Sequence, residues 1–265
     1  MSFLFIAKNP VFMNARTMST ILKTATLSAL SFSISGVAQD QKSESTPTSR
    51  QTEESFLPKD KSQGYRYLLY NPSSEAKKKK RKWPLLIFLH GRGERGNNLN
   101  LVKKHGPPKI VENKNLPFII ASPQCPGTDL WWKPDVVAGL VDELLRKYPV
   151  DPDKVYLTGL SQGGFGTWAT AARHPDKFAA VAPVCGGGKT EWAKKFGSLP
   201  IWNFHGDADK VVPVGLSRIM VEAVEKAGGR IKYTEYPGVR HDSWTQTYRN
   251  PKLYDWLLSH SRNKK

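Results

Sequence analysis

Residues 155–168 read VYLTGLSQGGFGTW, and this stretch decides the fold. Val155–Thr158 is an apolar and β-branched run that is typical of a buried strand, whereas the residues from Gly163 to Arg173 favour a helix. Between them lies Gly159-Leu160-Ser161-Gln162-Gly163, a G-x-S-x-G pentapeptide. The pattern predicts a sharp strand-to-helix turn with Ser161 at its apex and with glycines where strand and helix approach each other.

Further apolar runs alternate with helix patterns from about residue 64 onward. Strands are expected at residues 64–70, 85–89, 118–121, 155–158, 178–184, 201–204 and 231–236, and helices at 135–148, 163–173, 214–227 and 250–260. Such a succession indicates an α/β fold, with a mostly parallel central sheet and helices on both of its faces. Because only residues 185–200 separate two of the strands, no large lid domain is expected there.

A serine hydroxyl is a poor nucleophile at neutral pH, so Ser161 needs a neighbouring base. In proteins with this turn the order along the chain is serine, acid, histidine. His205, His241 and His260 follow Ser161. His205 lies at a strand end before a glycine, which favours a structural role, and His260 lies at the end of the last helix. His241, in the loop after the last strand, is therefore the predicted general base.

Two carboxylates, Asp207 and Asp209, follow the strand at 201–204. The acid has to orient His241 and stabilise its charged form. Asp209 precedes the segment Lys-Val-Val-Pro that begins the next helix, and it is the predicted acid. Asp207 is expected to tie the turn together through an Asx-type hydrogen bond.

Backbone amides have to stabilise the negative charge that develops on a carbonyl oxygen during acyl transfer. The amide of Gln162, directly after the serine, is one predicted donor. The second is expected from the glycine-rich loop HGRGERG (90–96), at Arg92. The alternatives for this loop are a simple turn or a phosphate cradle. It lacks the G-K-[ST] ending of a P-loop, which argues against nucleotide binding.

Residues 64–262 resemble the α/β-hydrolase superfamily, and within it compact secreted esterases related to polyhydroxybutyrate depolymerases, feruloyl esterases and predicted secreted peptidases. The resembling segments are LIFLHGRGERG (86–96), ASPQCP (121–126), VYLTGLSQGGFGTW (155–168), APVCGGG (182–188), FHGDADKVVP (204–213) and YPGVRHDSW (236–244). The resemblance implies a catalytic triad of Ser161, Asp209 and His241, with neither a metal nor an organic cofactor. Arg92 departs from the small residue that relatives often carry. Its backbone amide still serves, and its cationic side chain either narrows the site or meets an acidic group of the substrate.

The resemblance implies hydrolysis of carboxylic esters through an acyl-enzyme, on short-chain, aryl or carbohydrate-linked esters. Trp131, Trp132 and Trp244, and also Trp192, are expected on loops at the active end, where they either stack on sugar rings or aryl acids or pack beneath the loops. A serine peptidase on the same scaffold is one alternative function. A non-catalytic binding protein of the cell envelope is another.

The N-terminal residues are typical of a targeting segment. Residues 1–38 combine scattered positive charges with an uncharged stretch at 25–38, and small residues precede Gln39. That stretch is short for a membrane span. The sequence predicts a signal peptide at 1–38, export to the periplasm or the medium, a flexible linker at 39–55, and a catalytic domain at 56–265.

The net charge of +17 is high and has a partly local cause, the run Lys-Lys-Lys-Lys-Arg-Lys at residues 77–82. We expect a solvated loop between two early strands. No nucleic-acid-binding motif accompanies the run, so specific nucleic-acid binding is not expected, although the positive field favours anionic surfaces. Cys125 and Cys185 both follow predicted strands, and the sequence leaves open whether they form a disulfide or stay buried thiols. Two cysteines alone are too few for a zinc site.

Overall fold

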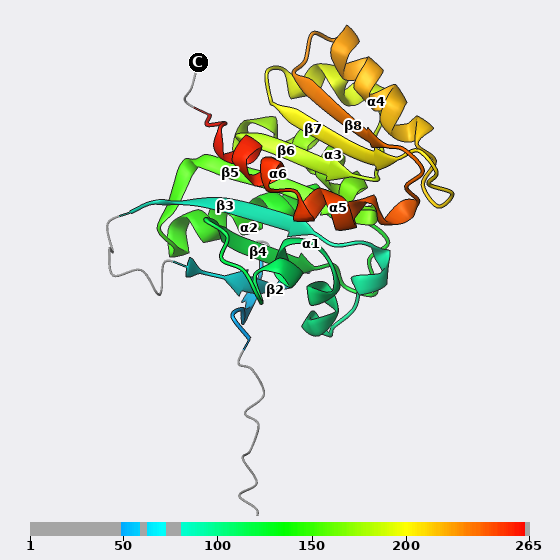
Figure 1. The fold of residues 1–265 in the computed structure, drawn as a ribbon. Helices are drawn as coiled ribbons and strands as arrows, with labels where there is room; N and C mark the ends of the chain where they lie inside the picture. Colours follow the sequence, from blue (N-terminus) through cyan, green and yellow to red (C-terminus); the bar gives the residue numbers. More distant parts are fainter. Residues whose placement is uncertain (1–48, 59–62, 73–80, 263–265) are drawn as a thin grey trace, which may run out of the picture. The chain divides into compact units, whose positions relative to one another are not determined.

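The structure of the chain is a computed structural model that describes residues 49–58, 63–72 and 81–262. These residues form an eight-stranded sheet in the order β1-β2-β4-β3-β5-β6-β7-β8 (Figure 1). The strands are β1 (Thr52–Phe56), β2 (Tyr65–Tyr70), β3 (Trp83–Leu89), β4 (Ile119–Gln124), β5 (Val150–Leu160), β6 (Ala180–Val184), β7 (Ile201–Gly206) and β8 (Ile231–Tyr236). The pairings from β4 through β3 to β8 are all parallel, whereas β1 and β2 are antiparallel to their neighbours. This arrangement confirms the predicted, mostly parallel sheet.

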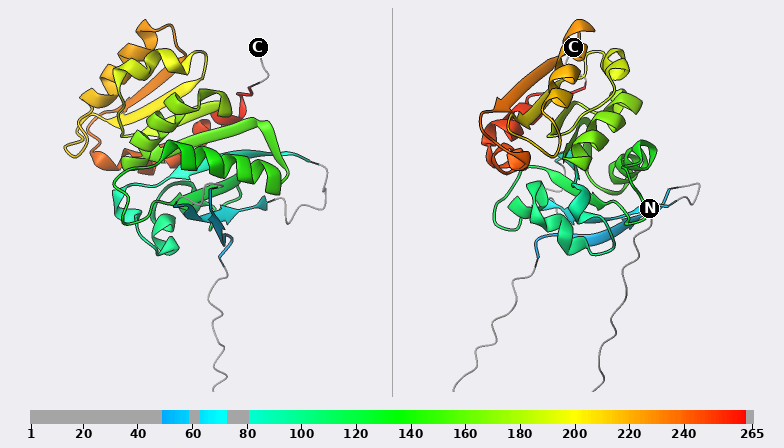
Figure 2. Two further views of the ribbon diagram at one scale, coloured as in Figure 1. Left: turned by 180° about the vertical axis from the view of Figure 1, so that it is seen from behind. Right: turned by 90° about the vertical axis from the view of Figure 1, so that its right-hand side faces the viewer.

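Helices cover both faces of the sheet (Figure 1, Figure 2). The α-helices are α1 (Gly106–Ile110), α2 (Pro134–Lys147), α3 (Gln162–Arg173), α4 (Gly215–Lys226), α5 (Trp244–Arg249) and α6 (Pro251–Leu258). The 3₁₀ turns are η2 (Arg92–Glu94), η3 (Leu99–Lys104), η4 (Pro175–Lys177), η5 (Thr190–Phe196) and η6 (His241–Ser243). The segment between β6 and β7 contains η5 and no inserted lid domain, as the sequence predicts.

The continuous apolar strands follow from this burial on both faces, since successive side chains of a strand point to opposite sides. In β3, Leu85, Ile87 and Leu89 pack into a cluster that includes side chains of α2, α3 and α4. Leu86 and Phe88 pack into a second cluster that includes side chains of α5 and α6. A strand with only one buried face would instead alternate apolar and polar residues.

The predicted boundary between linker and catalytic domain at residue 56 is wrong. Thr52–Phe56 forms β1 and pairs with β2 along its whole length. The Gln51 side chain also donates a hydrogen bond to the carbonyl of Pro108, at 2.9 Å. Because β1 lies at the edge of the sheet and buries only Phe56, its other residues are polar and resemble a linker in composition.

Several sequence-based predictions lie outside the described residues. These are the signal peptide at 1–38, residues 39–48 of the linker and residues 77–80 of the basic run. Arg81 and Lys82, the last residues of that run, are exposed directly before β3, which agrees with the predicted solvated loop. Within the described ranges, no helix combines the length and the hydrophobicity needed to cross a membrane.

Candidate active site

Ser161 is the single residue between the end of β5 and the start of α3. Its backbone has φ 52° and ψ −117°, a conformation that non-glycine residues rarely adopt. Neighbouring groups hold this strained backbone in place. Its amide donates to the carbonyl of Val184 at 3.0 Å and lies 3.3 Å from Sγ of Cys185, and its carbonyl accepts from the amide of Phe165 at 3.0 Å. The strain lifts the hydroxyl out of both the strand and the helix.

The two glycines of the pentapeptide allow β5, α3 and β3 to approach closely. A Cβ atom on Gly163 would lie 1.9 Å from the carbonyl oxygen of Leu89, and one on Gly159 would lie 2.4 Å from the carbonyl oxygen of Gly163. No side chain fits at such distances. This confirms the prediction that the glycines stand where strand and helix approach each other. At both positions, backbone atoms would clash with any side chain.

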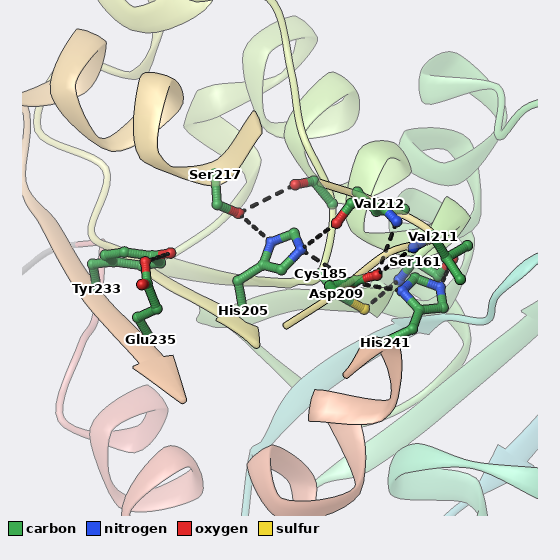
Figure 3. A network of polar contacts seen from close by, with 11 residues as sticks. Ser161, Cys185, His205, Asp209, Val211, Val212, Ser217, Tyr233, Glu235 and His241 are labelled. Carbon is green, nitrogen blue, oxygen red and sulfur yellow. Dashed lines mark hydrogen bonds and ion pairs between the residues drawn. The ribbon is translucent and has the colours of Figure 1, made fainter. Parts of the chain in front are cut away.

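The structure brings Ser161, His241 and Asp209 together at the carboxyl ends of β5, β7 and β8 (Figure 3). His241 begins η6, and its Nε2 lies 2.9 Å from Oγ of Ser161. Its Nδ1 lies 2.6 Å from Oδ2 of Asp209. Since the carboxylate accepts a hydrogen bond from Nδ1–H, the lone pair of Nε2 faces the serine hydroxyl. The three side chains form one continuous chain of hydrogen bonds.

Asp209 is held through both of its carboxylate oxygens. Oδ1 accepts from the amides of Val211 at 2.8 Å and Val212 at 2.9 Å. Oδ2 lies close to His241 and also 3.2 Å from Nε2 of His205. Burial by itself would raise the pKa of this carboxyl, but the hydrogen bonds from His241, Val212 and Val211 outweigh burial and hold the pKa below its usual value. Asp209 is therefore ionised at neutral pH.

The other candidates for the acid and the base lie elsewhere. Asp207 accepts a hydrogen bond from the amide of Gly238 at 2.7 Å, which links the end of β7 to the turn after β8. His260 follows α6, where its Nδ1 lies 2.7 Å from the carbonyl of Trp256. Among the described residues, neither side chain forms a hydrogen bond or an ion pair with Ser161 or His241.

His205 is fully buried and forms part of the same polar network (Figure 3). Its Nε2 faces two acceptors, the carbonyl of Val212 at 2.9 Å and the carboxylate of Asp209, so this nitrogen carries a proton. Burial lowers the pKa of His205, which keeps the ring neutral, and its Nδ1 then accepts from the hydroxyl of Ser217 at 2.7 Å. The structural role predicted for His205 did not include this contact with the acid. The signal in the sequence is the four-residue spacing of His205 and Asp209 across a turn.

The two predicted oxyanion donors, the amides of Gln162 and Arg92, both begin helical turns. Gln162 is the first residue of α3, and Arg92 is the first residue of η2. The first amides of a helix have no acceptor within it, and neither of these donates to another backbone carbonyl of the described chain. The Gln162 side chain bonds to the carbonyl of Leu130, which fixes it against the loop of Trp131.

His90 holds the loop that carries the Arg92 amide. The ring is buried, and its Nε2 accepts from the amide of Cys125 at 3.0 Å, so Nδ1 carries the proton and donates to the carbonyl of Gly91 at 2.6 Å. Burial is the main cause that lowers the pKa of His90 to about 4, so the ring is neutral at physiological pH. The sequence alone does not indicate this role of His90.

A pocket of about 650 Å³ opens around Ser161 and His241. Leu130, Phe165 and Val212 form much of its apolar wall, and no segment of the described chain closes it as a separate lid domain.

Two of the predicted tryptophans line this pocket. Trp131 is 58% exposed with its ring edge against Phe165, and Trp244 packs edge-on against His241. Both rings are within reach of a bound substrate.

The other two tryptophans have structural positions. Trp132, predicted to bind substrate, is buried, and its Nε1 donates to the carbonyl of His90 at 3.3 Å. Of the two positions that the sequence leaves open for Trp132, the structure has packing beneath a loop, since the ring contacts His90 and Tyr65 and does not line the pocket. Trp192 is partly buried on the cluster that covers one face of the sheet.

Cys125 and Cys185 are both buried, and both thiols are free. Of the two possibilities that the sequence leaves open, the structure has the unpaired thiols. Across the described residues, no cluster of histidine, cysteine, aspartate and glutamate has the arrangement of a metal site.

Comparison with known proteins agrees with this architecture. Residues 135–253, which include Ser161, Asp209 and His241, match the Phospholipase/Carboxylesterase family. The esterase NocK of Nocardia uniformis subsp. tsuyamanensis, described as putative, is 36% identical over 148 residues, which are 51% of this chain and 42% of that protein. Poly(3-hydroxyalkanoate) depolymerase C of Paucimonas lemoignei is 40% identical over 67 residues, which are 22% of this chain and 16% of the depolymerase.

The chain spans less than half of the length of these curated relatives. Among solved structures, a thermostable esterase superposes with a TM-score of 0.70 and 33% identity, over 80% of this chain and 63% of the esterase. The fold, the family match and these similarities agree with one another. The chain has the α/β-hydrolase fold and is similar to esterases with that fold.

Proposed function

We propose that this protein hydrolyses carboxylic esters through an acyl-enzyme formed on Ser161. The observation that carries the proposal is the continuous chain of hydrogen bonds from Ser161 through His241 to Asp209, with distances of 2.9 and 2.6 Å. An ordinary surface serine has no imidazole at hydrogen-bond distance whose other nitrogen is fixed by a buried carboxylate. The carboxylate selects the tautomer whose Nε2 accepts the serine proton.

In the first half-reaction, Oγ of Ser161 attacks the ester carbonyl carbon while Nε2 of His241 takes the hydroxyl proton. The electron pair of the carbonyl bond moves to its oxygen, which the amides of Gln162 and Arg92 stabilise. Removal of one such donor typically costs about 10²- to 10³-fold in kcat. The tetrahedral intermediate then collapses, the bond to the alcohol oxygen breaks, and His241 returns the proton to the leaving alcohol.

In the second half-reaction, a water molecule attacks the acyl-enzyme while His241 again takes a proton. Collapse of this intermediate breaks the bond between the acyl carbon and Oγ, and the proton returns to Ser161. One ester and one water give one acid and one alcohol, and the enzyme ends as it began. Asp209 stays ionised throughout and stabilises the imidazolium form of His241.

The pocket and the relatives support a substrate class of short-chain, aryl or carbohydrate-linked esters. The pocket is not closed by an inserted lid domain, and exposed Trp131 and half-exposed Trp244 offer aromatic faces to a ring. The likeness to poly(3-hydroxyalkanoate) depolymerase C extends the range to esters within a polymer. Export through residues 1–38 belongs to the same proposal, and sequencing of the mature N-terminus tests it, with Gln39 as the expected first residue.

The decisive experiment measures turnover of p-nitrophenyl acetate, butyrate and octanoate, methyl ferulate and acetylated xylan, with Ser161→Ala as the control. We expect turnover of at least one ester by the wild type and none by Ser161→Ala, with the same circular dichroism spectrum and melting temperature for both. Wild-type activity in Ser161→Ala on any ester would refute the assignment of the nucleophile.

Two further arms separate the alternative functions. Anilides with matched acyl groups test the peptidase alternative, since preferred cleavage of the anilide would contradict ester hydrolysis as the main activity. A fluorophosphonate probe tests the non-catalytic alternative. We expect labelling of the wild type and none of Ser161→Ala, whereas an unlabelled and inactive wild type would favour a binding protein.

A further inference from the structure

Glu94 is the one acidic side chain among the described residues that line the pocket around Ser161. It ends η2, two residues after the proposed oxyanion donor Arg92, and its side chain is only 9% exposed. Its carboxylate makes no hydrogen bond to any described residue. Its one close partner there is Nε2 of His105, at 3.9 Å, which is beyond hydrogen-bond distance.

The carboxylate of Glu94 lies in the same part of the pocket as the proposed nucleophile. Oε2 of Glu94 and Cβ of Ser161 lie 3.2 and 3.6 Å from the same point, the position that a Cβ atom on Gly91 would occupy. A substrate whose carbonyl carbon is bonded to Ser161 therefore brings its neighbouring groups close to this carboxylate.

A nearly buried carboxylate without hydrogen bonds is unfavourable, and most such groups in proteins have a partner. Here it also opposes the reaction, because the intermediate places a second negative charge near it. His105 does not compensate this charge. Burial is the main cause that lowers the pKa of His105, so its ring is neutral at physiological pH although Glu94 acts in the opposite direction. The carboxylate lines the open pocket, so its donor is water in the free protein and a group of the substrate once a substrate displaces that water.

The charges of the pocket decide which kind of donor fits. Arg92 and Arg95 line the same pocket, and Nη1 of Arg95 donates to the carbonyl of Asp129 at 2.7 Å, which fixes its guanidinium there. Two positive charges in the same pocket disfavour the binding of a cationic ammonium group there. A neutral hydroxyl suits the site, since it donates its proton to the carboxylate and accepts from a guanidinium.

We propose that Glu94 binds a hydroxyl group next to the scissile ester, so that the substrates are hydroxylated esters. This inference rests on the proposed ester hydrolysis and adds the chemical class of the substrate. The hydroxyl has two possible sources, the alcohol part or the acyl part of the ester.

Two pairs of esters test the inference and distinguish these sources. Ethylene glycol monoacetate and its methyl ether differ by a hydroxyl in the alcohol part, and methyl glycolate and methyl methoxyacetate by one in the acyl part. We expect the wild type to prefer the hydroxyl member of at least one pair, in kcat/KM, by about tenfold or more, because an unmade hydrogen bond to a buried charge is costly. The pair that shows the preference identifies the source.

In Glu94→Leu we expect this preference to fall to about one, since no carboxylate remains to discriminate. Glu94→Gln keeps the shape and one acceptor oxygen and should give a preference between the two; it carries the test if Glu94→Leu does not fold. Glu191→Leu, which removes an exposed carboxylate on η5, is the matched control and should keep the wild-type preference.

His105→Gln separates binding by Glu94 from an effect through its neighbour. We expect this variant to keep the preference. Its loss in His105→Gln, an unchanged preference in the Glu94 variants, or equal turnover of both members by the wild type would each overturn the inference. Equal turnover leaves ester hydrolysis standing, whereas failure of the proposed function shows as no turnover and no fluorophosphonate labelling.

Discussion

Nε2 of His205 lies 3.2 Å from Oδ2 of Asp209, the same carboxylate oxygen that Nδ1 of His241 approaches to 2.6 Å. Oδ1 of Asp209 accepts hydrogen bonds from the amides of Val211 and Val212, and Oδ2 accepts one from His241 with His205 in close contact. Val211, Val212 and His205 belong to the scaffold. They fix the carboxylate plane before a substrate binds, which places His241 at the correct distance from Ser161.

Replacement of His205 tests this positioning. In His205→Phe, we expect kcat to fall on the order of tenfold or more, because Asp209 loses a close polar neighbour and Val212 loses the hydrogen bond to its carbonyl, so the carboxylate loses part of its orientation. KM should change less than kcat, since His205 does not itself line the pocket. His205→Gln, whose amide can donate to Asp209, should recover much of the loss. Steady-state kinetics across a pH series checks this, and an equal loss in kcat for both variants with unchanged pH profiles would indicate a merely structural role.

The two aspartates after β7 form a natural pair of variants. In Asp209→Asn, the side-chain NH₂ group faces His241 and favours the wrong tautomer, so we expect kcat to fall on the order of 10³- to 10⁴-fold. In Asp207→Asn, the retained oxygen still accepts from Gly238, and we expect activity within a few-fold of wild type. The kcat of both variants is measured on the best ester of the panel. A larger loss in Asp207→Asn than in Asp209→Asn would mean that Asp207 is the catalytic acid and Asp209 stabilises the turn.

The close approach of α3 to β3 predicts a large effect of one methyl group. In Gly163→Ala, the new Cβ would meet the Leu89 carbonyl at 1.9 Å, so we expect the free energy of unfolding to fall by about 3 kcal/mol or more. Gly215→Ala is the control, because nothing lies within 4 Å of a Cβ at this first residue of α4. There we expect no loss and a gain of up to about 1 kcal/mol. Urea unfolding checks both, and equal stabilities would contradict the packing.

Protonation of His90 predicts how stability depends on pH. The pKa of His90 is about 4 in the folded protein and 6.5 in the reference state, so the unfolded chain takes up the proton first as the pH falls. Its contribution to stability is complete above pH 6.5, is lost as the pH falls from there towards about 4, and amounts to about 3 kcal/mol.

The control for this pH effect is His90→Gln, whose side chain does not titrate and can still accept from the Cys125 amide. We expect the free energy of unfolding of this variant to depend less steeply on pH over the same range. The remaining slope comes from His205 and His105, whose pKa values are also lowered by burial. If wild type and variant had the same slope, the assignment to His90 would be wrong.

The sequence predicts the parts of this fold that have strong local signals. The strands from β2 to β7 contain apolar runs, and the turn at Ser161 has glycines at the two positions where backbone approaches backbone. The order serine, acid, histidine then identifies Asp209 and His241, because the ends of parallel strands meet at one edge of the sheet.

The remaining features depend on contacts between distant segments. β1 buries only Phe56, so its sequence has no strand periodicity. Trp131 and Trp132 are neighbours in the sequence, yet one is exposed in the pocket and the other is buried against His90. The role of Glu94 follows from the lack of hydrogen bonds around its carboxylate, which only the three-dimensional arrangement reveals.

The two buried thiols have a consequence for how the protein is made. Burial raises the pKa of Cys125 to about 11 and that of Cys185 still further, so neither forms the thiolate that attacks disulfides or alkylating reagents. The fold thus contains no covalent cross-link whose formation depends on the redox potential of the compartment. We expect the same native state after synthesis under reducing or oxidising conditions, with no requirement for an oxidant, a disulfide isomerase or a protecting reductant.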